Sequence, residues 1–343
     1  DAGFEELLYR TALDTGEASG RDVCMALFEQ GVLTDAGGEY EALSSRQTEI
    51  YGFLREAIRT LRLTPAQLAL DPCTASSVVV DPSSGEVLAC VTYPGYDGNR
   101  LANRVDGEYY ARLLADRSLP LYNNATQQRT APGSTFKPVT AAAALTEGII
   151  TTQTRIEDIG IFEEITPSPR CWIFPGGRHG NESVVDAIRD SCNYFFYSLG
   201  YAMSTGGDLL WEEDTYEPRQ GVETLARYAA MFGLGENSGI EIGESAPQIA
   251  DDFPVTAAIG QSNHNYTTTQ LARYAAVLAN QGTLYDLTLV LRSGETSQGG
   301  EASQSREASR SEAAAAEGAA PRGEWLSAIS PAAWDAVREG MRQ

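Results

Sequence analysis

The chain has 343 residues and 42% of them are hydrophobic, which is enough for about two globular domains with sizeable cores. Lys and Arg together number 25 and Asp and Glu together number 47, so the formal net charge is -22. This charge opposes binding to nucleic acids and to anionic membrane surfaces, and no apolar run approaches the roughly 18 residues that span a bilayer.

Residues 1–64 are predicted to form a helical extension. Apolar residues recur at spacings of three and four, with glycine-containing turns between the segments. The segments with this pattern are residues 4–13, 20–33 and 44–63. A short helix is predicted next at residues 64–70, with Thr64 as its N-cap and Pro65 at its first position.

The clearest strand signal lies at residues 76–94. Two β-branched runs are joined there by the turn sequence of residues 81–85, which predicts a hairpin. A hairpin alone is marginally stable, so we expect it to belong to a larger sheet. Helices are predicted further along the chain at residues 107–115, 139–149, 183–203 and 268–282.

The C-terminal part begins with a segment of low complexity. Residues 293–323 are small and polar, and we expect a solvated, disordered insertion there. Residues 324–343 then resume an amphipathic pattern, with Ser330 as the cap of a helix and Pro331 at its start.

The cysteines and histidines do not have the spacing of a metal site. They are Cys24, Cys73, Cys90, Cys171, Cys192, His179 and His264. We therefore expect no metal and no other cofactor. Most of the cysteines are expected to be small buried side chains, although one disulfide remains open in an extracytoplasmic protein. Both histidines lie in loop-like segments, which favours surface or structural roles.

One short segment, TAPGSTFKPVT at residues 130–140, carries a hydroxyl and an amine one helical turn apart. A lysine shielded from water loses its charge readily, so Lys137 could take the proton of Ser134 and make it a nucleophile. A helix start also offers free N–H groups to a developing oxyanion. This pattern favours acyl transfer through a serine ester. In isolation it is weak, because a capped helix with a solvated lysine has the same sequence.

A second polar pair follows in the segment RDSCNYFF. Ser191 could relay a proton to a leaving amine, and Asn193 could orient Lys137 or a substrate amide. The alternative is that both residues form a helix cap or a turn.

Taken together, these motifs resemble the penicillin-binding proteins. PGSTFKPV followed by SCN is similar to the first two motifs of that family, whose signature is Ser-x-x-Lys, Ser-Asp-Asn and Lys-Thr-Gly. Residues 78–99, 232–244 and 257–285 also resemble family segments in the expected order. From about residue 65 to 290 the chain is similar to class B peptidoglycan D,D-transpeptidases.

The resemblance implies an α+β fold of the penicillin-binding and β-lactamase type. An antiparallel central sheet would be flanked by helices, with an α-helical subdomain, and the transpeptidase domain would cover residues 65–292 and continue in residues 324–343. The third motif, Lys-Thr-Gly, occurs nowhere in the chain and would follow Gln343. We therefore expect a fragment whose sheet is incomplete, with further departures from the family at Cys192 and Ser262.

The resemblance also implies roles for individual residues. Ser134 would be acylated and Lys137 would be its base, with Ser191 and Asn193 as the second-motif pair. Gly133 and Gln261 would contact the substrate.

The implied partners are peptidoglycan stem peptides, β-lactam antibiotics and cell-wall synthesis proteins. The implied location is the extracytoplasmic face of a bacterial membrane, with an anchor outside this sequence. The alternatives are a serine hydrolase of the D,D-carboxypeptidase or β-lactamase type and a non-catalytic scaffold.

Overall fold

A computed structural model describes most of the chain, and it divides into two compact units. The described residues are 11–13, 15–35, 37–63, 65–68, 74–116, 118–207, 209, 216–290 and 323–342. The predictions for residues 4–10, Thr64, Cys73 and the insertion at 293–322 lie outside these residues. The first unit comprises residues 1–75 and 92–122, and the second comprises residues 76–91 and 123–343. The sequence was divided at residue 64, so residues 92–122 are grouped differently in the structure.

The first unit is built from short helices around a small apolar cluster. Its elements are α2 (Gly20–Glu29), α3 (Glu39–Ser44), α4 (Ile50–Arg59), η1 (Pro65–Leu68), η2 (Gly98–Arg100) and α5 (Gly107–Ala115). The buried residues of the cluster are Val23, Leu27, Leu33, Ala57 and Leu63. The helices predicted at residues 20–33 and 107–115 are confirmed as α2 and α5. The helix predicted at 44–63 is shorter in the structure, where α4 covers only its middle part, and the described residues of the segment predicted at 64–70 form the 3₁₀ turn η1.

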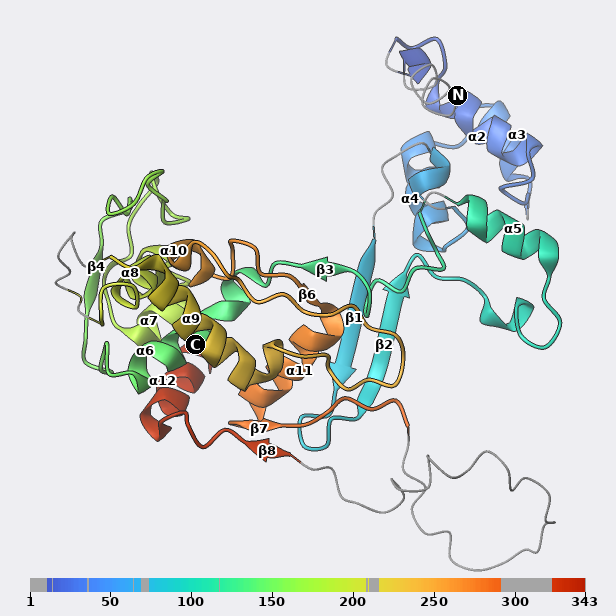
Figure 1. The fold of residues 1–343 in the computed structure, drawn as a ribbon. Coiled ribbons are helices and arrows are strands. Elements are labelled where there is room, and N and C mark those ends of the chain that lie inside the picture. The colour runs from blue at the N-terminus through green and yellow to red at the C-terminus, as the bar shows by residue number, and fades with distance from the viewer. Residues whose placement is uncertain are drawn as a thin grey trace, which may run out of the picture. The chain divides into compact units, whose positions relative to one another are not determined.

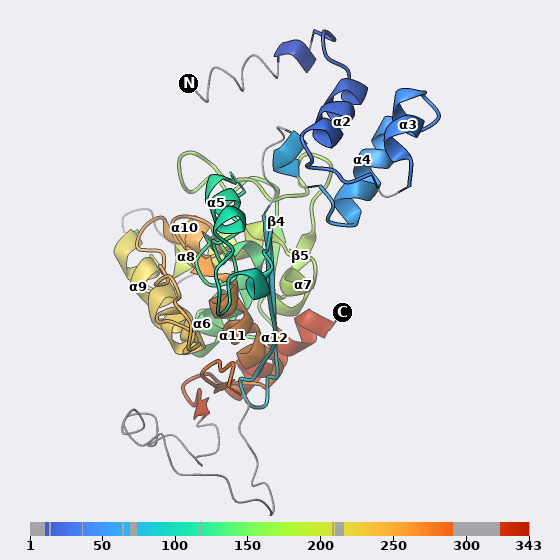
Figure 2. The same ribbon diagram turned by 90° about the vertical axis from the view of Figure 1, so that its right-hand side faces the viewer.

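Two fully buried helices form the centre of the second unit (Figure 1). Every residue of α6 (Lys137–Thr146) from Lys137 to Ala144 is buried, as is every residue of α8 (Asn193–Ala202) from Phe195 onward. A helix that is apolar on all sides must be covered on all sides. The covering helices are α7 (Val184–Arg189), α9 (Pro218–Ala229), α10 (Pro254–Ala257), α11 (Thr268–Ala279) and α12 (Pro331–Arg342). α12 packs against α6 and α7 (Figure 2).

The single helix predicted at residues 183–203 is wrong, because the structure divides it into α7 and α8. Ser191 lies at the break with a φ of 54°, a left-handed conformation that an α-helix excludes. Ser183 caps α7 with a capping box. The first residue of α8 is Asn193, so the break brings the second motif to a helix N-terminus.

The strands form two-stranded sheets in the part of the chain that is described. β1 (Ala75–Val80) and β2 (Val87–Tyr93) make the predicted hairpin. α11 lies along this hairpin (Figure 1), where Ser76 Oγ is 2.7 Å from Thr268 Oγ1 and Asn280 donates to the carbonyl oxygen of Pro82. The exposed side chains of Val79, Leu88 and Val91 fit a sheet that lacks further strands. Helices packed with antiparallel strands confirm the α+β class.

Three shorter strand pairs complete the second unit. They are β3 (Arg129–Thr130) with β6 (Tyr266–Thr267), β4 (Ile156–Asp158) with β5 (Gly180–Glu182), and β7 (Thr283–Leu284) with β8 (Glu324–Trp325). Each pair is antiparallel. The described helices include none that is long and apolar enough to cross a membrane.

Two glycines hold the segment with Ser134 against the loop that follows α10. The N–H of Gly133 donates to the carbonyl oxygen of Gly260 over 2.9 Å. Gly260 has a φ of 73°, and a Cβ there would lie 2.1 Å from the carbonyl oxygen of Gly133. Only glycine therefore permits this approach, which fixes the 3₁₀ turn η3 (Gly133–Phe136) ahead of α6.

We predict that Gly260→Ala destabilises the protein more than Gly148→Ala does. Gly148 also has a φ of 73°, but no atom lies within 4 Å of its Cβ position. The stability loss of Gly148→Ala therefore measures only the cost of placing alanine in a left-handed conformation. That penalty is roughly 1–2 kcal/mol. The clash at Gly260 should add about 1–3 kcal/mol, as overpacking does. Urea unfolding of both variants measures the difference, and equal losses would show that the two loops separate freely.

Candidate active site

Lys137 and Ser134 are connected through Ser191. Lys137 Nζ donates to Ser191 Oγ over 2.9 Å, and Ser191 Oγ donates to Ser134 Oγ over 3.0 Å. Nζ also donates to the carbonyl oxygen of Ser191 over 2.7 Å and to Asn193 Oδ1 over 2.6 Å. The four residues predicted from the two motifs are therefore brought together, with Ser191 between the hydroxyl and the amine.

The hydroxyl and the amine differ in their access to solvent. Ser134 is exposed on η3, whereas Lys137 is 1% exposed at the first position of α6. Both line a cavity of about 440 Å³, together with Pro138, Ile188, Arg189, Leu271, Tyr274, Leu278 and Met341. The hydroxyl of Ser134 is therefore accessible from this cavity, while the amine of Lys137 is largely shielded from water.

Burial lowers the pKa of Lys137 to about 8. The ring of Phe196 lies 5.5 Å from Nζ and contributes to the apolar surroundings. With this pKa, about one amine in ten is neutral at pH 7, whereas a solvated lysine is almost entirely charged. A base whose pKa lies near neutrality can exchange a proton efficiently at neutral pH.

The left-handed turn at Ser191 points both its carbonyl and its hydroxyl oxygen toward Lys137. The N–H of Ser191 donates to Ile188 and that of Cys192 to Ala187, which ends α7 with backbone hydrogen bonds. The tetrapeptide from Asp190 to Asn193 contains three residue types that favour turns, and this signal could have predicted the break.

Gly133 and Gln261, the predicted substrate contacts, lie beside each other. The amide nitrogen of Gln261 is 3.7 Å from the position of a Cβ on Gly133, and Gln261 is exposed. Ser262, which stands where the family has glycine, keeps a left-handed φ of 67°. Its hydroxyl donates to the carbonyl oxygen of Asp252 over 2.7 Å, which compensates for part of the conformational penalty.

A cluster of four metal-ligand side chains lies directly behind Ser191 and was not predicted. Its members are Asp158, Cys171, His179 and Cys192, and one donor atom from each lies within 4.8 Å of all the others. Asp158 ends β4, His179 precedes β5, and Cys192 is the N-cap of α8. Cys192 is buried as expected, but the surface role considered for His179 is wrong, because its side chain is 6% exposed.

The distances in this cluster, which we call the Cys–His cluster, suit a tetrahedral ion. Two sulfurs bound to Zn²⁺ at about 2.3 Å lie about 3.8 Å apart, and the sulfurs of Cys171 and Cys192 are 4.0 Å apart. Cys171 Sγ is 3.4 Å from His179 Nδ1, and Cys192 Sγ is 3.6 Å from Asp158 Oδ2. Asp158 and His179 now share a hydrogen bond of 2.7 Å, which a metal would replace.

The two thiols share one hydrogen bond, which lowers the pKa of Cys171 and raises the pKa of Cys192. A metal that binds both sulfurs would therefore have to displace the proton of Cys192. His179 Nε2 is buried without a hydrogen-bond partner among the described residues. Metal-bound histidines commonly donate their second N–H to an acceptor, and this nitrogen has no such acceptor among the described residues. Four protein ligands would leave no open position, which is typical of a structural site.

His264 has the structural role that the sequence favoured. It is buried, its ring lies 4.3 Å from that of Phe136, and burial lowers its pKa to about 4. Nδ1 accepts from the N–H of Ala250 over 3.0 Å, and Nε2 donates to the carbonyl oxygen of Ala257 over 3.2 Å. Because both ring nitrogens are used, the neutral ring anchors the segment that carries Gly260 and Gln261.

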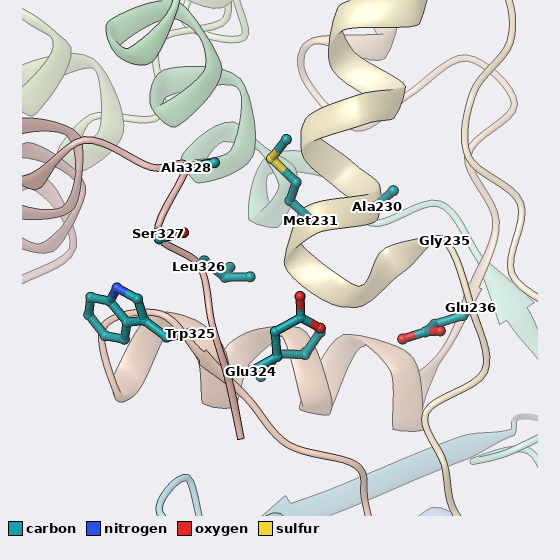
Figure 3. A pocket seen from close by; sticks show the side chains of 10 residues that line it. Ala230, Met231, Gly235, Glu236, Glu324, Trp325, Leu326, Ser327 and Ala328 are labelled. Carbon is teal, nitrogen blue, oxygen red and sulfur yellow. The ribbon is translucent and has the colours of Figure 1, made fainter. Parts of the chain in front are cut away.

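A second cavity of about 440 Å³ contains none of the predicted site residues. It lies where Ala230 and Met231 face Glu324 and Trp325 (Figure 3). Glu236 at its edge forms an ion pair with Arg273. The cavity at Ser134 is therefore the better candidate for chemistry.

Comparisons with known proteins show which family the chain is similar to. Residues 75–343 match the family model of the penicillin binding protein transpeptidase domain. Peptidoglycan D,D-transpeptidase MrdA of Haemophilus influenzae is 33% identical over 223 residues, which are 60% of this chain and 31% of that protein. The chain thus spans about a third of the length of this curated relative.

Solved structures show the same similarity. A chain from a peptidoglycan synthase complex has a TM-score of 0.61 at 29% identity, over 78% of this chain and 41% of that one. The imipenem acyl-enzyme complex of penicillin-binding protein A from Mycobacterium tuberculosis has a TM-score of 0.53 at 27% identity, over 63% of this chain and 48% of that one. Since the family model covers most of the sequence, this chain belongs to the penicillin-binding protein transpeptidase family.

Proposed function

We propose that the protein containing this chain is a class B peptidoglycan D,D-transpeptidase, which cross-links stem peptides through an ester on Ser134. The observation that carries this proposal is the hydrogen-bonded series from Ser134 through Ser191 to Lys137, with distances of 3.0 and 2.9 Å. It joins an exposed hydroxyl to a buried amine of lowered pKa, as a serine nucleophile requires.

Acylation begins when Ser134 Oγ attacks the carbonyl carbon of the penultimate D-alanine. The proton of Ser134 passes to Ser191, whose own proton passes to neutral Lys137. The N–H groups at the start of η3 and α6 favour the negative charge on the carbonyl oxygen. The bond to the terminal D-alanine then breaks, and its nitrogen receives a proton from Lys137 through Ser191.

Transfer of the acyl group reverses these steps. The amine of a neighbouring stem peptide attacks the ester carbonyl, and its proton passes through Ser191 to Lys137. The bond from the carbonyl carbon to Ser134 Oγ then breaks, and Ser134 Oγ takes this proton back through Ser191. Asn193 holds the amine of Lys137 in place through its side-chain oxygen, and Gly133 and Gln261 contact the peptide beside the nucleophile. A D,D-carboxypeptidase or β-lactamase would use water in place of the amine, and a scaffold would form no ester.

The same serine should react with β-lactams. The 27%-identical penicillin-binding protein A forms an acyl-enzyme with imipenem, which supports this expectation. By the same argument the protein would act on the extracytoplasmic face of the membrane, anchored by a segment outside this sequence. The similarity to a chain of a peptidoglycan synthase complex supports cell-wall synthesis proteins as partners.

The proposal predicts that a fluorescent penicillin labels Ser134. The test uses the protein extended beyond Gln343 through the expected third motif. Ser134→Ala should abolish the label, and Lys137→Ala should slow it by about 10²- to 10⁴-fold, as loss of a general base does, while circular dichroism shows that the helices are retained. A label that persists for many minutes indicates a transferase, and rapid turnover indicates a hydrolase. An unlabelled wild-type protein would leave the scaffold as the explanation.

We predict that Lys137 titrates near pH 8. It is the only lysine among the 343 residues, so ¹⁵N-lysine labelling yields a single side-chain signal to follow by NMR. Burial favours the neutral amine, so the folded signal should titrate at about 8 and the urea-unfolded signal at about 10.4. The labelling rate should rise as the pH rises through the folded value. A folded pKa of 10 or more would contradict the role of Lys137 as base.

A second candidate function is metal binding. The Cys–His cluster offers two sulfurs, an imidazole and a carboxylate, which is a set that Zn²⁺ prefers. A bound ion would fix Cys192 and so hold Ser191 and Asn193 at Lys137.

This candidate predicts that the chain binds one Co²⁺ with visible absorption of a tetrahedral thiolate site, and that Zn²⁺ displaces it. Cys171→Ser and Cys192→Ser should each weaken binding by about 10-fold or more. Cys90→Ser serves as a control, because Cys90 lies on β2, outside the cluster. Removal of the metal by a chelator should lower the thermal unfolding midpoint. Equal binding in Cys90→Ser and Cys192→Ser would place the ion elsewhere.

A further inference from the structure

We propose that Cys171 and Cys192 are an oxidative modification site, in which a disulfide between them withdraws Ser191 and Asn193 from Lys137. The consequence for acylation rests on the proposed function, whereas the disulfide and the displacement of Lys137 do not. Such a bond would make the assembly of the site depend on the redox state of its surroundings.

The two sulfurs are already close enough for this bond. They lie 4.0 Å apart, and the side chains are 1% and 0% exposed. A disulfide requires an S–S distance of about 2.05 Å, so the sulfurs must approach each other by about 2 Å. The other described thiols lie outside this cluster: Cys24 is in α2, and Cys90 is on β2.

The positions of the two cysteines suggest which one reacts first. Cys171 begins a segment whose next residue, Trp172, is 61% exposed, so a small opening of this segment exposes its sulfur. Cys192 lies deeper, at the N-cap of the buried helix α8. Cys171 would therefore attack the oxidant, and Cys192 would resolve the mixed disulfide.

The reaction is a thiol–disulfide exchange with an external disulfide as oxidant. The two S–H bonds of Cys171 and Cys192 break and one S–S bond forms between them. The two protons and two electrons released reduce the oxidant disulfide to two thiols. Glutathione disulfide and thiol–disulfide oxidoreductases are oxidants of this class, and extracytoplasmic compartments keep such pairs oxidised.

The coupling to Lys137 follows from the position of Cys192 between two ligands of that amine. The three recorded acceptors of Nζ are Ser191 Oγ, the Ser191 carbonyl oxygen and Asn193 Oδ1. The rest of α8 is held in the core by Phe195 and Phe196, which are 0% exposed. If the disulfide draws Cys192 toward Cys171, the backbone must therefore change at Ser191, the left-handed residue between α7 and α8. The two oxygens of Ser191 then move away from the amine.

A metal at the Cys–His cluster and the disulfide exclude each other, because both need the same two sulfurs. A bound ion protects the thiols, and its loss permits their oxidation. Added Zn²⁺ should therefore block formation of the bond, which separates this disulfide from nonspecific oxidation of other thiols.

The test uses the ¹⁵N-lysine-labelled chain, freed of metal with a chelator and incubated with mixtures of reduced and oxidised glutathione. Mass spectrometry of tryptic digests should show peptides joined through Cys171 and Cys192 with the loss of two hydrogens. The single Lys137 signal should shift as the link forms and should return on reduction. Zn²⁺ added before the oxidant should prevent both changes.

The controls distinguish a specific bond from damage. Cys90→Ser should behave as the wild type, whereas Cys171→Ser and Cys171→Ala should show neither the link nor the signal shift on treatment with oxidised glutathione. In the extended protein, labelling by penicillin should fall about 10²-fold on oxidation and recover on reduction, as a displacement of about 1 Å predicts. Absence of the link in the wild type, or a link that leaves the Lys137 signal unchanged, would overturn the proposal. Since neither readout requires acylation, failure of penicillin labelling would leave this result intact.

Discussion

The second unit depends on the burial of one amine between the first residues of two buried helices. Lys137 begins α6 and Asn193 begins α8, and both helices are covered on all sides. A buried polar group without a partner costs about 1–3 kcal/mol, so the amine must find acceptors inside the protein. The joint between α7 and α8 supplies them, because its left-handed residue presents two oxygens and the next helix presents a third. The packing of α6 and α8 in the core therefore also brings the side chains of the candidate site together.

The joint is held from two sides. On one side Ser191 and Asn193 face Lys137, and on the other Cys192 faces Asp158 and Cys171. Alternating residues of one short segment therefore serve the nucleophile and the Cys–His cluster. In the proposed disulfide or metal-bound states, a change at Cys192 would therefore act on the amine through the two neighbouring residues, Ser191 and Asn193. This arrangement explains how a serine that is exposed to solvent can depend on groups that solvent does not reach.

The sequence predicted the parts of the site whose spacing is local. Ser134 and Lys137 lie one turn apart, and Ser191 and Asn193 are two residues apart, so both pairs could be recognised before any fold was known. The hairpin and α5 followed from equally local patterns. The break at Ser191 was missed because Phe195, Phe196 and Leu199 continue the apolar periodicity of residues 183–203, and because the force that opens the helix comes from Lys137, 54 residues away. The Cys–His cluster was missed for a related reason, since its ligands come from a strand end, two loops and a helix cap that only the fold brings together.

The other candidate bases are less suited than Lys137 to the proposed chemistry. Of the 25 basic residues, the other 24 are arginines, which stay charged and accept no proton. His264 uses both ring nitrogens in hydrogen bonds, and Nδ1 of His179 faces Asp158 and Cys171. Burial, with the charges of Asp190 and Asp186, raises the pKa of Glu182 to about 7, but this carboxyl does not line the cavity at Ser134. Among these groups of the described chain, Lys137 combines a lowered pKa, a place in the wall of that cavity and a hydrogen-bonded path to the hydroxyl.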